Sequence, residues 1–343
     1  MDTQIITNPS EQELNMLASA LRNGELVSIP TETVYGLGAN GLDPEAMDKI
    51  YAAKGRPSDN PLILHVPNSE SIKPLVTEVS NTAKLLMDTF WPGPLTITLP
   101  KSDLVPDRAT GGLPRVALRC PDHKVCRALL ERAGVPVAAP SANISGRPSP
   151  TTAQDVYHDM KGRISYILDA GPCTIGVEST VVEVHDDKVI ILRPGGITKA
   201  QLETVVSTVE YDTALVNATT KPKAPGMKYT HYAPDAPMTV VVGHPEVIAS
   251  TFKELSEGKE GPIGCLVSHE TYDLIKDDTR FMYHCFGHHG DALALGHDFY
   301  KSLLHFNENH VTLILAEGVN DDGFGVAIMN RMEKASGHHI IYK

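Results

Sequence analysis

The chain contains 343 residues, of which 41% are hydrophobic and 21% charged, and its formal net charge is −12. At about 150 residues per domain, this length predicts two domains, and the composition is that of a soluble globular protein. The acidic balance argues against a protein whose main task is to hold a nucleic-acid backbone, because that affinity depends on clustered Lys and Arg. The acidic net charge does not exclude a local basic pocket for one nucleotide.

The cysteines and the apolar runs indicate the compartment. The five cysteines form no CxxC pair and are odd in number, which disfavours a disulfide framework and fits a reducing cytosol. The first residues lack the basic and apolar regions of a signal peptide, and no run reaches the ~18 apolar residues of a membrane span. We therefore expect a cytoplasmic protein with no membrane association.

The first 206 residues alternate between helical and strand patterns. Ser10 and Glu13 form a capping box, a helical repeat follows, and Gly24 ends the helix. Further helices are predicted at 43–54, 81–90, 122–133, 152–160 and 198–207. Strands are predicted at 25–30, 61–66, 95–99, 115–119, 136–140, 165–169, 179–185 and 188–193. This order predicts an α/β domain with one twisted mixed sheet, flanking helices and a concave site.

The composition changes after residue 206. Residues 207–237 are rich in Thr, Lys and Pro and are predicted to be a linker or lid. From 238 to 343, strands (239–242, 263–267, 311–315) alternate with helices (245–257, 290–305, 324–336). This alternation predicts a smaller Rossmann-like α/β domain. No GxGxxG turn is present, so the sequence predicts no dinucleotide site there.

Five segments of the first domain combine polar or cationic side chains with a strand end or a Gly/Pro turn. Glycines let a backbone approach a ligand closely, hydroxyl and amide groups direct hydrogen bonds, and Lys and Arg match phosphate charge. Together they predict a concave nucleotide site at one edge of the sheet. The segments are 30–38, 54–60, 140–146, 177–181 and 192–196.

The ordered set of motifs resembles the threonylcarbamoyl-AMP synthase (YrdC-type) family. The matching blocks are Pro30-Thr-Glu-Thr-Val-Tyr-Gly-Leu-Gly38, Lys54-Gly-Arg56, Phe90-Trp-Pro-Gly-Pro94, Pro140-Ser-Ala-Asn143 and Glu178-Ser-Thr180. The segments 224–234 and 325–335 resemble those of the family's two-domain branch. Ala224 stands where Ser is common in the family, a mild departure.

The resemblance implies an activity. The family joins L-threonine, bicarbonate and ATP into threonylcarbamoyl-AMP and pyrophosphate, for modification of adenosine 37 in tRNAs that decode ANN codons. It implies a nucleotidyltransferase that uses Mg²⁺ bound to the ATP phosphates, with no metal site on the protein. It is compatible with a hand-off of the product to a threonylcarbamoyl transferase complex and with weak tRNA binding, and it leaves both open.

The resemblance also implies roles for single residues. Lys54 and Arg56 would be the catalytic cations on the triphosphate. Contacts to threonine would come from Thr33, His65, Arg119, Ala139 and Ser179. Contacts to ATP would come from Arg56, Asn60, Arg115, Ser141, Asn143, Ser149, Arg193, Lys228, His231 and Tyr232. Arg115 stands where the family more often has a small residue, which weakens that assignment.

Each residue taken alone has a structural explanation. Lys54 and Arg56 could complement a helix dipole, His65 could be a core histidine, and Thr33 could be a turn hydroxyl. Ser141 and Asn143 could cap a loop. A metal site among the histidines at 284, 288, 289, 297, 338 and 339 is disfavoured, because no spacing matches a known zinc motif.

Two other functions compete with the synthase hypothesis. An RNA-binding module could use a basic groove in the first domain, but the acidic total and the lack of an RNA-binding motif argue against it. A carbamoyl-transferring maturation factor would share the first domain, but would add zinc-binding and acylphosphatase-like modules. The sequence contains neither.

The basic and aromatic end of the linker suggests that it closes over ATP as a lid. We expect truncation after about residue 206 to lower pyrophosphate release sharply relative to the full chain. Full activity of the truncated chain would contradict a lid.

Overall fold

The computed structural model describes residues 2–215 and 231–343, which form two compact units. The first unit comprises 2–145, 149–174 and 178–215, and the second comprises 146–148, 175–177 and 231–343. None of the helices in these ranges is both long and apolar enough to cross a membrane. All five cysteines are free, and four of them are buried.

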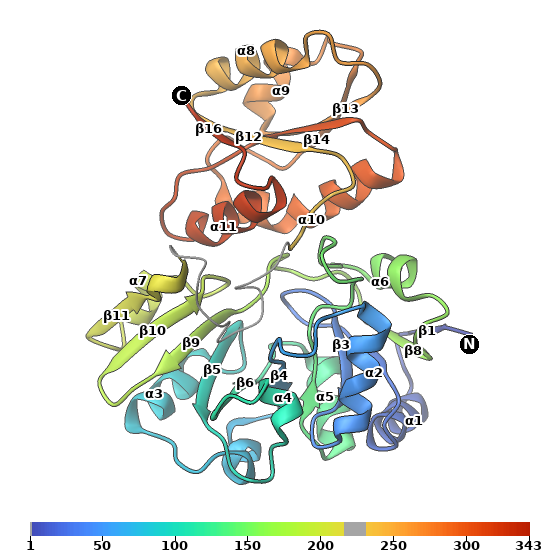
Figure 1. Cartoon of the computed structure of the whole chain (residues 1–343), viewed down its shortest axis with the longest axis vertical. Helices are drawn as coiled ribbons and strands as arrows, with labels where there is room; N and C mark the ends of the chain where they lie inside the picture. The colour runs from blue at the N-terminus through green and yellow to red at the C-terminus, as the bar shows by residue number, and fades with distance from the viewer. Residues whose placement is uncertain (1, 216–230) are drawn as a thin grey trace. The chain divides into compact units, whose positions relative to one another are not determined.

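The first unit is built on an eleven-stranded mixed sheet in the order β1-β8-β2-β3-β7-β4-β6-β5-β9-β10-β11 (Figure 1). The sheet contains parallel pairs such as β4 with β6 and antiparallel pairs such as β5 with β6. The strands are β1 (Gln4–Thr7), β2 (Val27–Ile29), β3 (Gly36–Asn40), β4 (Ile63–His65), β5 (Leu95–Pro100), β6 (Arg115–Arg119), β7 (Val137–Ala138), β8 (Tyr166–Asp169), β9 (Thr180–Val184), β10 (Lys188–Arg193) and β11 (Thr208–Tyr211).

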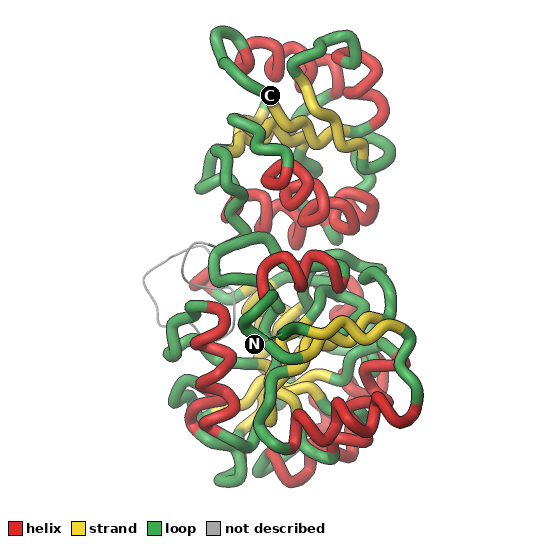
Figure 2. Tube along the Cα trace, turned by 90° about the vertical axis from the view of Figure 1, so that its right-hand side faces the viewer, coloured by secondary structure: helices red, strands yellow, loops and turns green. Residues whose placement is uncertain are grey.

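The helices of the first unit begin and end at residues suited to these positions. Side chains of Ser10, Asp43 and Thr152 accept hydrogen bonds from first-turn N–H groups, and Gly55 ends its helix with a left-handed backbone. Figure 2 shows the helices of this unit around its strands. The helices are α1 (Glu11–Arg22), α2 (Pro44–Lys54), α3 (Asn81–Phe90), α4 (Asp107–Thr110), α5 (Lys124–Ala133), α6 (Ala153–Met160) and α7 (Lys199–Glu203), with 3₁₀ turns at Ser69–Leu75 and Thr213–Leu215.

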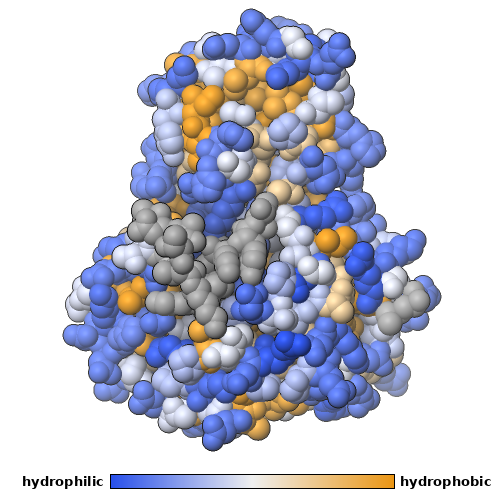
Figure 3. All heavy atoms as spheres, in the orientation of Figure 1, coloured by the Kyte–Doolittle hydropathy of each residue, from blue (hydrophilic) through white to orange (hydrophobic). Residues whose placement is uncertain are grey.

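Strand alternation divides the side chains of this sheet between two faces. The main core cluster takes Leu37 and Ala39 of β3, Leu64 of β4 and Ile97 of β5 on one face. On the opposite face, α1 and α5 pack over β2, β3 and β7 in a second core cluster. Burial of both faces accounts for the mostly hydrophilic surface that the first unit presents in Figure 3.

The second unit is a five-stranded sheet in the order β14-β13-β15-β12-β16, and every pair in it is parallel. The strands are β12 (Met238–Val242), β13 (Ile263–Val267), β14 (Phe281–Cys285), β15 (Leu313–Glu317) and β16 (Ile340–Tyr342). The helices are α8 (Pro245–Ser256), α9 (His269–Ile275), α10 (Ala292–Glu308) and α11 (Gly325–Ala335). Figure 1 shows α8 and α9 on one side of the sheet and α10 and α11 on the other.

The predicted fold class is confirmed: a large mixed sheet with flanking helices and a smaller Rossmann-like α/β unit. Several strands were not predicted. The sequence assigns no strand to residues 36–40, where β3 lies. A Cβ on Gly38 would lie 2.9 Å from both Val27 O and the Val137 side chain, so glycine allows close strand packing there. β11 lies in the range assigned to the linker and pairs with β10. β1, β14 and β16 are likewise absent from the predicted strands.

Candidate functional site

The candidate site lies on the face of the first sheet opposite the main core. Beyond β7 this face carries a small apolar cluster of Ile63, Ala117, Val181 and Leu192. The same alternation places polar side chains from neighbouring strands on this face, with His65 of β4 opposite Arg119 of β6 in the register. The other polar residues of this face are Thr96, Thr98, Arg115 and Ser179.

A buried ion pair joins two of the motif segments. Arg119 Nη2 lies 2.8 Å from Glu32 Oε2, and both side chains are at most 8% exposed. The two groups are close, but their geometry is not that of a hydrogen bond. Among the described residues, the two Glu32 carboxylate oxygens and Arg119 Nη2 therefore have no hydrogen-bond partner. Buried polar atoms of this kind are rare unless a ligand completes them. The sequence predicted Arg119, whereas Glu32 was not singled out although it lies within the 30–38 motif.

His65 is buried beside this pair. Its Nδ1 lies 3.2 Å from Ile63 O. Burial, and after it the neighbouring Arg119 charge, lowers the pKa of His65 to about 3. The imidazole is therefore neutral at physiological pH, and it can contribute a hydrogen bond but no charge.

Hydroxyl groups and Arg193 connect the next strands. Ser179 Oγ lies 2.8 Å from Thr96 Oγ1, and Arg193 Nη2 donates to Ser179 O at 2.9 Å. Gly195 approaches so closely that a Cβ there would lie 2.4 Å from the backbone of residues 178–180. A glycine is required at this position to bring the Arg193 segment against Ser179.

Lys54 ends α2 inside the protein. It is 2% exposed, and Nζ donates to the carbonyl oxygens of Ser141 and Asn143, the latter at 2.5 Å. The Lys54 carbonyl in turn accepts from Ser145 N at 2.9 Å. Lys54 therefore holds the loop that carries Ser141 and Asn143, two of the predicted nucleotide contacts.

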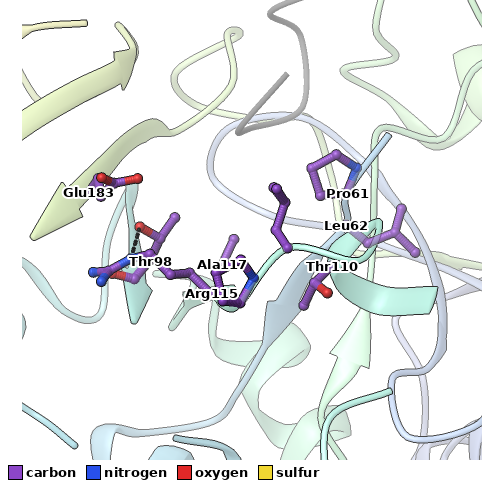
Figure 4. Close-up of a pocket in the computed structure, with 9 residues that line it drawn as sticks. Pro61, Leu62, Thr98, Thr110, Arg115, Ala117 and Glu183 are labelled. Atoms are coloured by element: carbon purple, nitrogen blue, oxygen red, sulfur yellow. Dashed lines mark hydrogen bonds between the residues drawn. The ribbon is translucent and has the colours of Figure 1, made fainter. Parts of the chain in front are cut away.

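A cavity of about 260 Å³ lies at the other end of the polar face (Figure 4). Arg115 lines it, with Nη2 donating to Thr98 O at 2.7 Å and to Val184 O at 2.8 Å. Ligand pockets usually measure roughly 300–1,000 Å³, so this cavity fits one part of a nucleotide. Its remaining lining residues are Pro61, Leu62, Thr110, Leu113, Pro114, Ala117 and Glu183.

The segment between Lys54 and this cavity carries two more predicted contacts. Arg56 Nη2 donates to Pro61 O at 3.2 Å. Asn60 is 2% exposed, and its Oδ1 has no hydrogen-bond partner among the described residues. The Asn60 backbone carbonyl accepts from Tyr51 of α2, which fixes the segment against that helix.

The other predicted residues of the first unit are also buried. Thr33 is fully buried, with Oγ1 2.8 Å from Thr31 Oγ1. Ser149 Oγ donates to Glu178 Oε1 at 2.6 Å. Ala139 N donates to Ile63 O at 3.0 Å, which joins the 140–146 segment to β4.

The linker residues divide differently. Lys228 lies outside the described residues. Tyr232 belongs to the second unit, where it is 5% exposed and packs 5.4 Å from Tyr300, with the Arg331 guanidinium over its ring. His231 lies 5.5 Å from the Tyr232 ring. Contacts of these residues to ATP as a lid stay predictions. Within the described ranges, no three His, Cys, Asp or Glu side chains are grouped to hold a metal.

The fold and its polar face define a two-unit α/β protein with a YrdC-type first domain, and comparisons agree. Residues 19–195 match the model of the Sua5, YciO and YrdC family, described as Telomere recombination. Residues 197–337 match the model described as Threonylcarbamoyl-AMP synthase, C-terminal domain. The chain therefore belongs to the threonylcarbamoyl-AMP synthase family, which confirms the resemblance in the sequence, and the second match places it in the two-domain branch.

Individual relatives are similar over nearly their whole length. The threonylcarbamoyl-AMP synthase of Bacillus subtilis is 46% identical over 333 residues, which cover 97% of this chain and 95% of the relative. That of Pyrococcus abyssi is 44% identical over 96% of both chains. A crystal structure of P. abyssi Sua5 complexed with L-threonine superposes with a TM-score of 0.90 and 42% identity, covering 99% of this chain and all of the other.

The lowered pKa of His65 predicts a pH dependence of stability. Its folded pKa of about 3 lies below the unfolded value near 6.5, so the unfolded chain binds more protons between these values. The free energy of unfolding should fall as the pH drops below ~6.5, and by pH 5 His65 alone should lower it by about 2 kcal/mol.

His65→Gln should remove that part of the pH dependence. Urea unfolding at pH 7.5 and pH 5 can be followed by Trp91, the single tryptophan, which lies in the first unit. An equal pH dependence in wild type and variant would contradict a neutral, buried His65.

Proposed function

We propose that this chain is an L-threonylcarbamoyladenylate synthase, a nucleotidyltransferase that converts L-threonine, bicarbonate and ATP into threonylcarbamoyl-AMP and pyrophosphate. The observation that supports this most directly is the buried pair of Arg119 and Glu32, in which both Glu32 oxygens and Arg119 Nη2 have no hydrogen-bond partner among the described residues. A buried guanidinium with a free donor matches the carboxylate of an amino acid. Neutral His65 lies opposite Arg119 in the strand register.

Threonine would occupy the part of the polar face around Arg119. Its carboxylate would pair with Arg119, and its side-chain hydroxyl and amine would reach Thr33, His65, Ser179 and the backbone of Ala139. All of these residues are at most 5% exposed, so a bound threonine would be separated from water. Exclusion of water matters because the carbamate intermediate is labile.

ATP would extend from this position toward the cavity at Arg115. Arg56 and Arg193 supply positive charge for the phosphates, with hydroxyl or amide groups from Asn60, Ser141, Asn143 and Ser149. Pro61, Leu113, Pro114 and Ala117 give the cavity apolar walls suited to a flat ring. Mg²⁺ would arrive as MgATP, held by phosphate oxygens and water. The sequence further predicts ATP contacts from Lys228, His231 and Tyr232.

The reaction needs no protein nucleophile. The threonine ammonium and bicarbonate give an N-carboxylate, one water and one released proton. An oxygen of this carboxylate then attacks the α-phosphorus of ATP, the bond from that phosphorus to the bridging oxygen breaks, and pyrophosphate leaves. Guanidinium groups that are already fixed by hydrogen bonds, as Arg193 is by Ser179, stabilise the developing charge without reorganisation. Positioning the three reactants is the remaining task.

The product would serve threonylcarbamoylation of adenosine 37 in tRNAs that decode ANN codons. We propose that the enzyme acts in the cytoplasm and passes threonylcarbamoyl-AMP to a threonylcarbamoyl transferase complex. Its own affinity for tRNA would be weak, since the chain has a formal net charge of −12.

Pyrophosphate release tests the reaction directly. Purified protein with MgATP and bicarbonate should release pyrophosphate only when L-threonine is present, and release should also require bicarbonate. Release without threonine would contradict the proposal. RNA binding with a steep salt dependence and no turnover would favour an RNA-binding module.

Variants of the buried pair test the threonine position. Arg119→Lys removes the planar guanidinium with its paired donors. Threonine binding should therefore weaken by roughly 2 kcal/mol or more, which corresponds to a KM for threonine about 30-fold higher. Glu32→Gln should raise the KM for threonine and leave that for ATP nearly unchanged. Glu131→Gln, on an exposed part of α5, is the matched control. An effect of Glu32→Gln on ATP alone would contradict this placement.

A further inference from the structure

We infer that Lys54 is a positioning residue for the nucleotide loop 141–145 and not a ligand of the ATP phosphates. This inference rests on the proposed function, because it concerns the same nucleotide site. It replaces the phosphate contact that the sequence predicts for Lys54.

The contacts of Lys54 all lead to this loop. Its Nζ donates to the carbonyls of Ser141 and Asn143, and its own carbonyl accepts from Ser145 N. Two of the three ammonium donors are thus directed at carbonyl oxygens. A phosphate contact would require the chain to leave a position in which it is 2% exposed.

A second anchor holds the same loop from another helix. Asp159 of α6 accepts from Ile144 N at 3.0 Å and is buried. Its negative charge raises the pKa of Lys54, which burial and then Arg56 lower well below its usual range. Lys54 of α2 and Asp159 of α6 therefore hold the 141–145 loop from two different helices.

The loop connects this pair to the nucleotide site. Its Ser141 and Asn143 carbonyls accept from Lys54, and an isolated bridge joins Ser141 to Gly36 of the 30–38 motif. With the carbonyls held, the side chains of Ser141 and Asn143 are kept in place for the nucleotide. Preorganised groups of this kind lower the cost of binding.

Arg56 provides the contrast. It lies two residues further on, beyond the left-handed Gly55, and donates to the carbonyl of Pro61, which lines the cavity at Arg115. The Lys54-Gly-Arg56 motif thus sends one cation inward to the loop and the other toward the cavity. The two cations should respond differently when the number of ligand phosphates is changed.

The experiment compares the binding of AMP, ADP and ATP to full-length wild type, Lys54→Met and Arg56→Met by calorimetry. If Lys54 positions the loop, Lys54→Met should weaken all three nucleotides by the same factor, about tenfold or ~1.4 kcal/mol. Arg56→Met should weaken ATP more than ADP and ADP more than AMP, because each phosphate adds charge. A loss in Lys54→Met that grows with phosphate number would overturn the inference.

Three further measurements keep the test decisive. Amide hydrogen exchange at Ile144 and Ser145 should speed up in Lys54→Met and not in Arg56→Met. Lys54→Gln, which retains two donors without charge, should bind nucleotides better than Lys54→Met; equal losses would count against positioning. Asp159→Ala, which loosens the loop from its other side, should reproduce the phosphate-independent pattern even if Lys54→Met fails to fold.

Threonine binding separates the two proposals. L-Threonine should bind Lys54→Met with wild-type affinity, which also shows that the fold is intact. A wild-type protein that binds none of the three nucleotides would contradict the proposed function itself. A wild type that binds them, with a phosphate-dependent loss in Lys54→Met, would contradict the positioning role alone.

Discussion

The structure depends on a sheet that is buried on both faces, one of which is the main apolar core while the other is apolar in part and polar in part. Strand alternation gives the main core Leu64, Ile97 and Leu118, and places His65, Thr96 and Arg119 on the other side. Polar side chains shielded from water need partners. Where α1 and α5 cover this face it is filled by hydrocarbon, and where they do not, its polar groups are available to a ligand.

The buried charges of the first unit are held in different ways. Arg193 and Lys54 donate to backbone carbonyls of neighbouring segments, which fixes the position of both cations. Arg119 instead faces Glu32 at 2.8 Å, with hydrogen-bonding capacity left over. Removal of one partner of such a buried pair lowers stability strongly, because the remaining charge is then buried without compensation. The carbonyl contacts therefore fix Arg193 and Lys54, whereas the pair at Arg119 leaves buried hydrogen-bonding groups for a substrate.

The second unit follows another physical rule. Its five parallel strands need crossover helices, so apolar strands such as Ile263–Val267 are covered on both faces. Several of its histidines lie beside carboxylates, as His289 does with Glu317 at 2.7 Å, and no metal-binding group of three is found among residues 231–343. Tyr232 is packed here against Tyr300, although the sequence places it in the linker.

The sequence by itself determined the fold class, most helices and the family, because caps, periodicity and ordered motifs are local signals. Ser10, Asp43 and Gly55 act at the helix ends where their chemistry predicts. Only the tertiary structure decided which motif side chains meet. The pairing of Glu32 with Arg119, and of Lys54 with the Ser141 and Asn143 carbonyls, joins positions about 90 residues apart. The order of the strands in the sheet determines such contacts, and this order cannot be predicted from a local sequence pattern. β11 and β16 were missed for the same reason, since their partners in the sheet stabilise them more than their own sequence does.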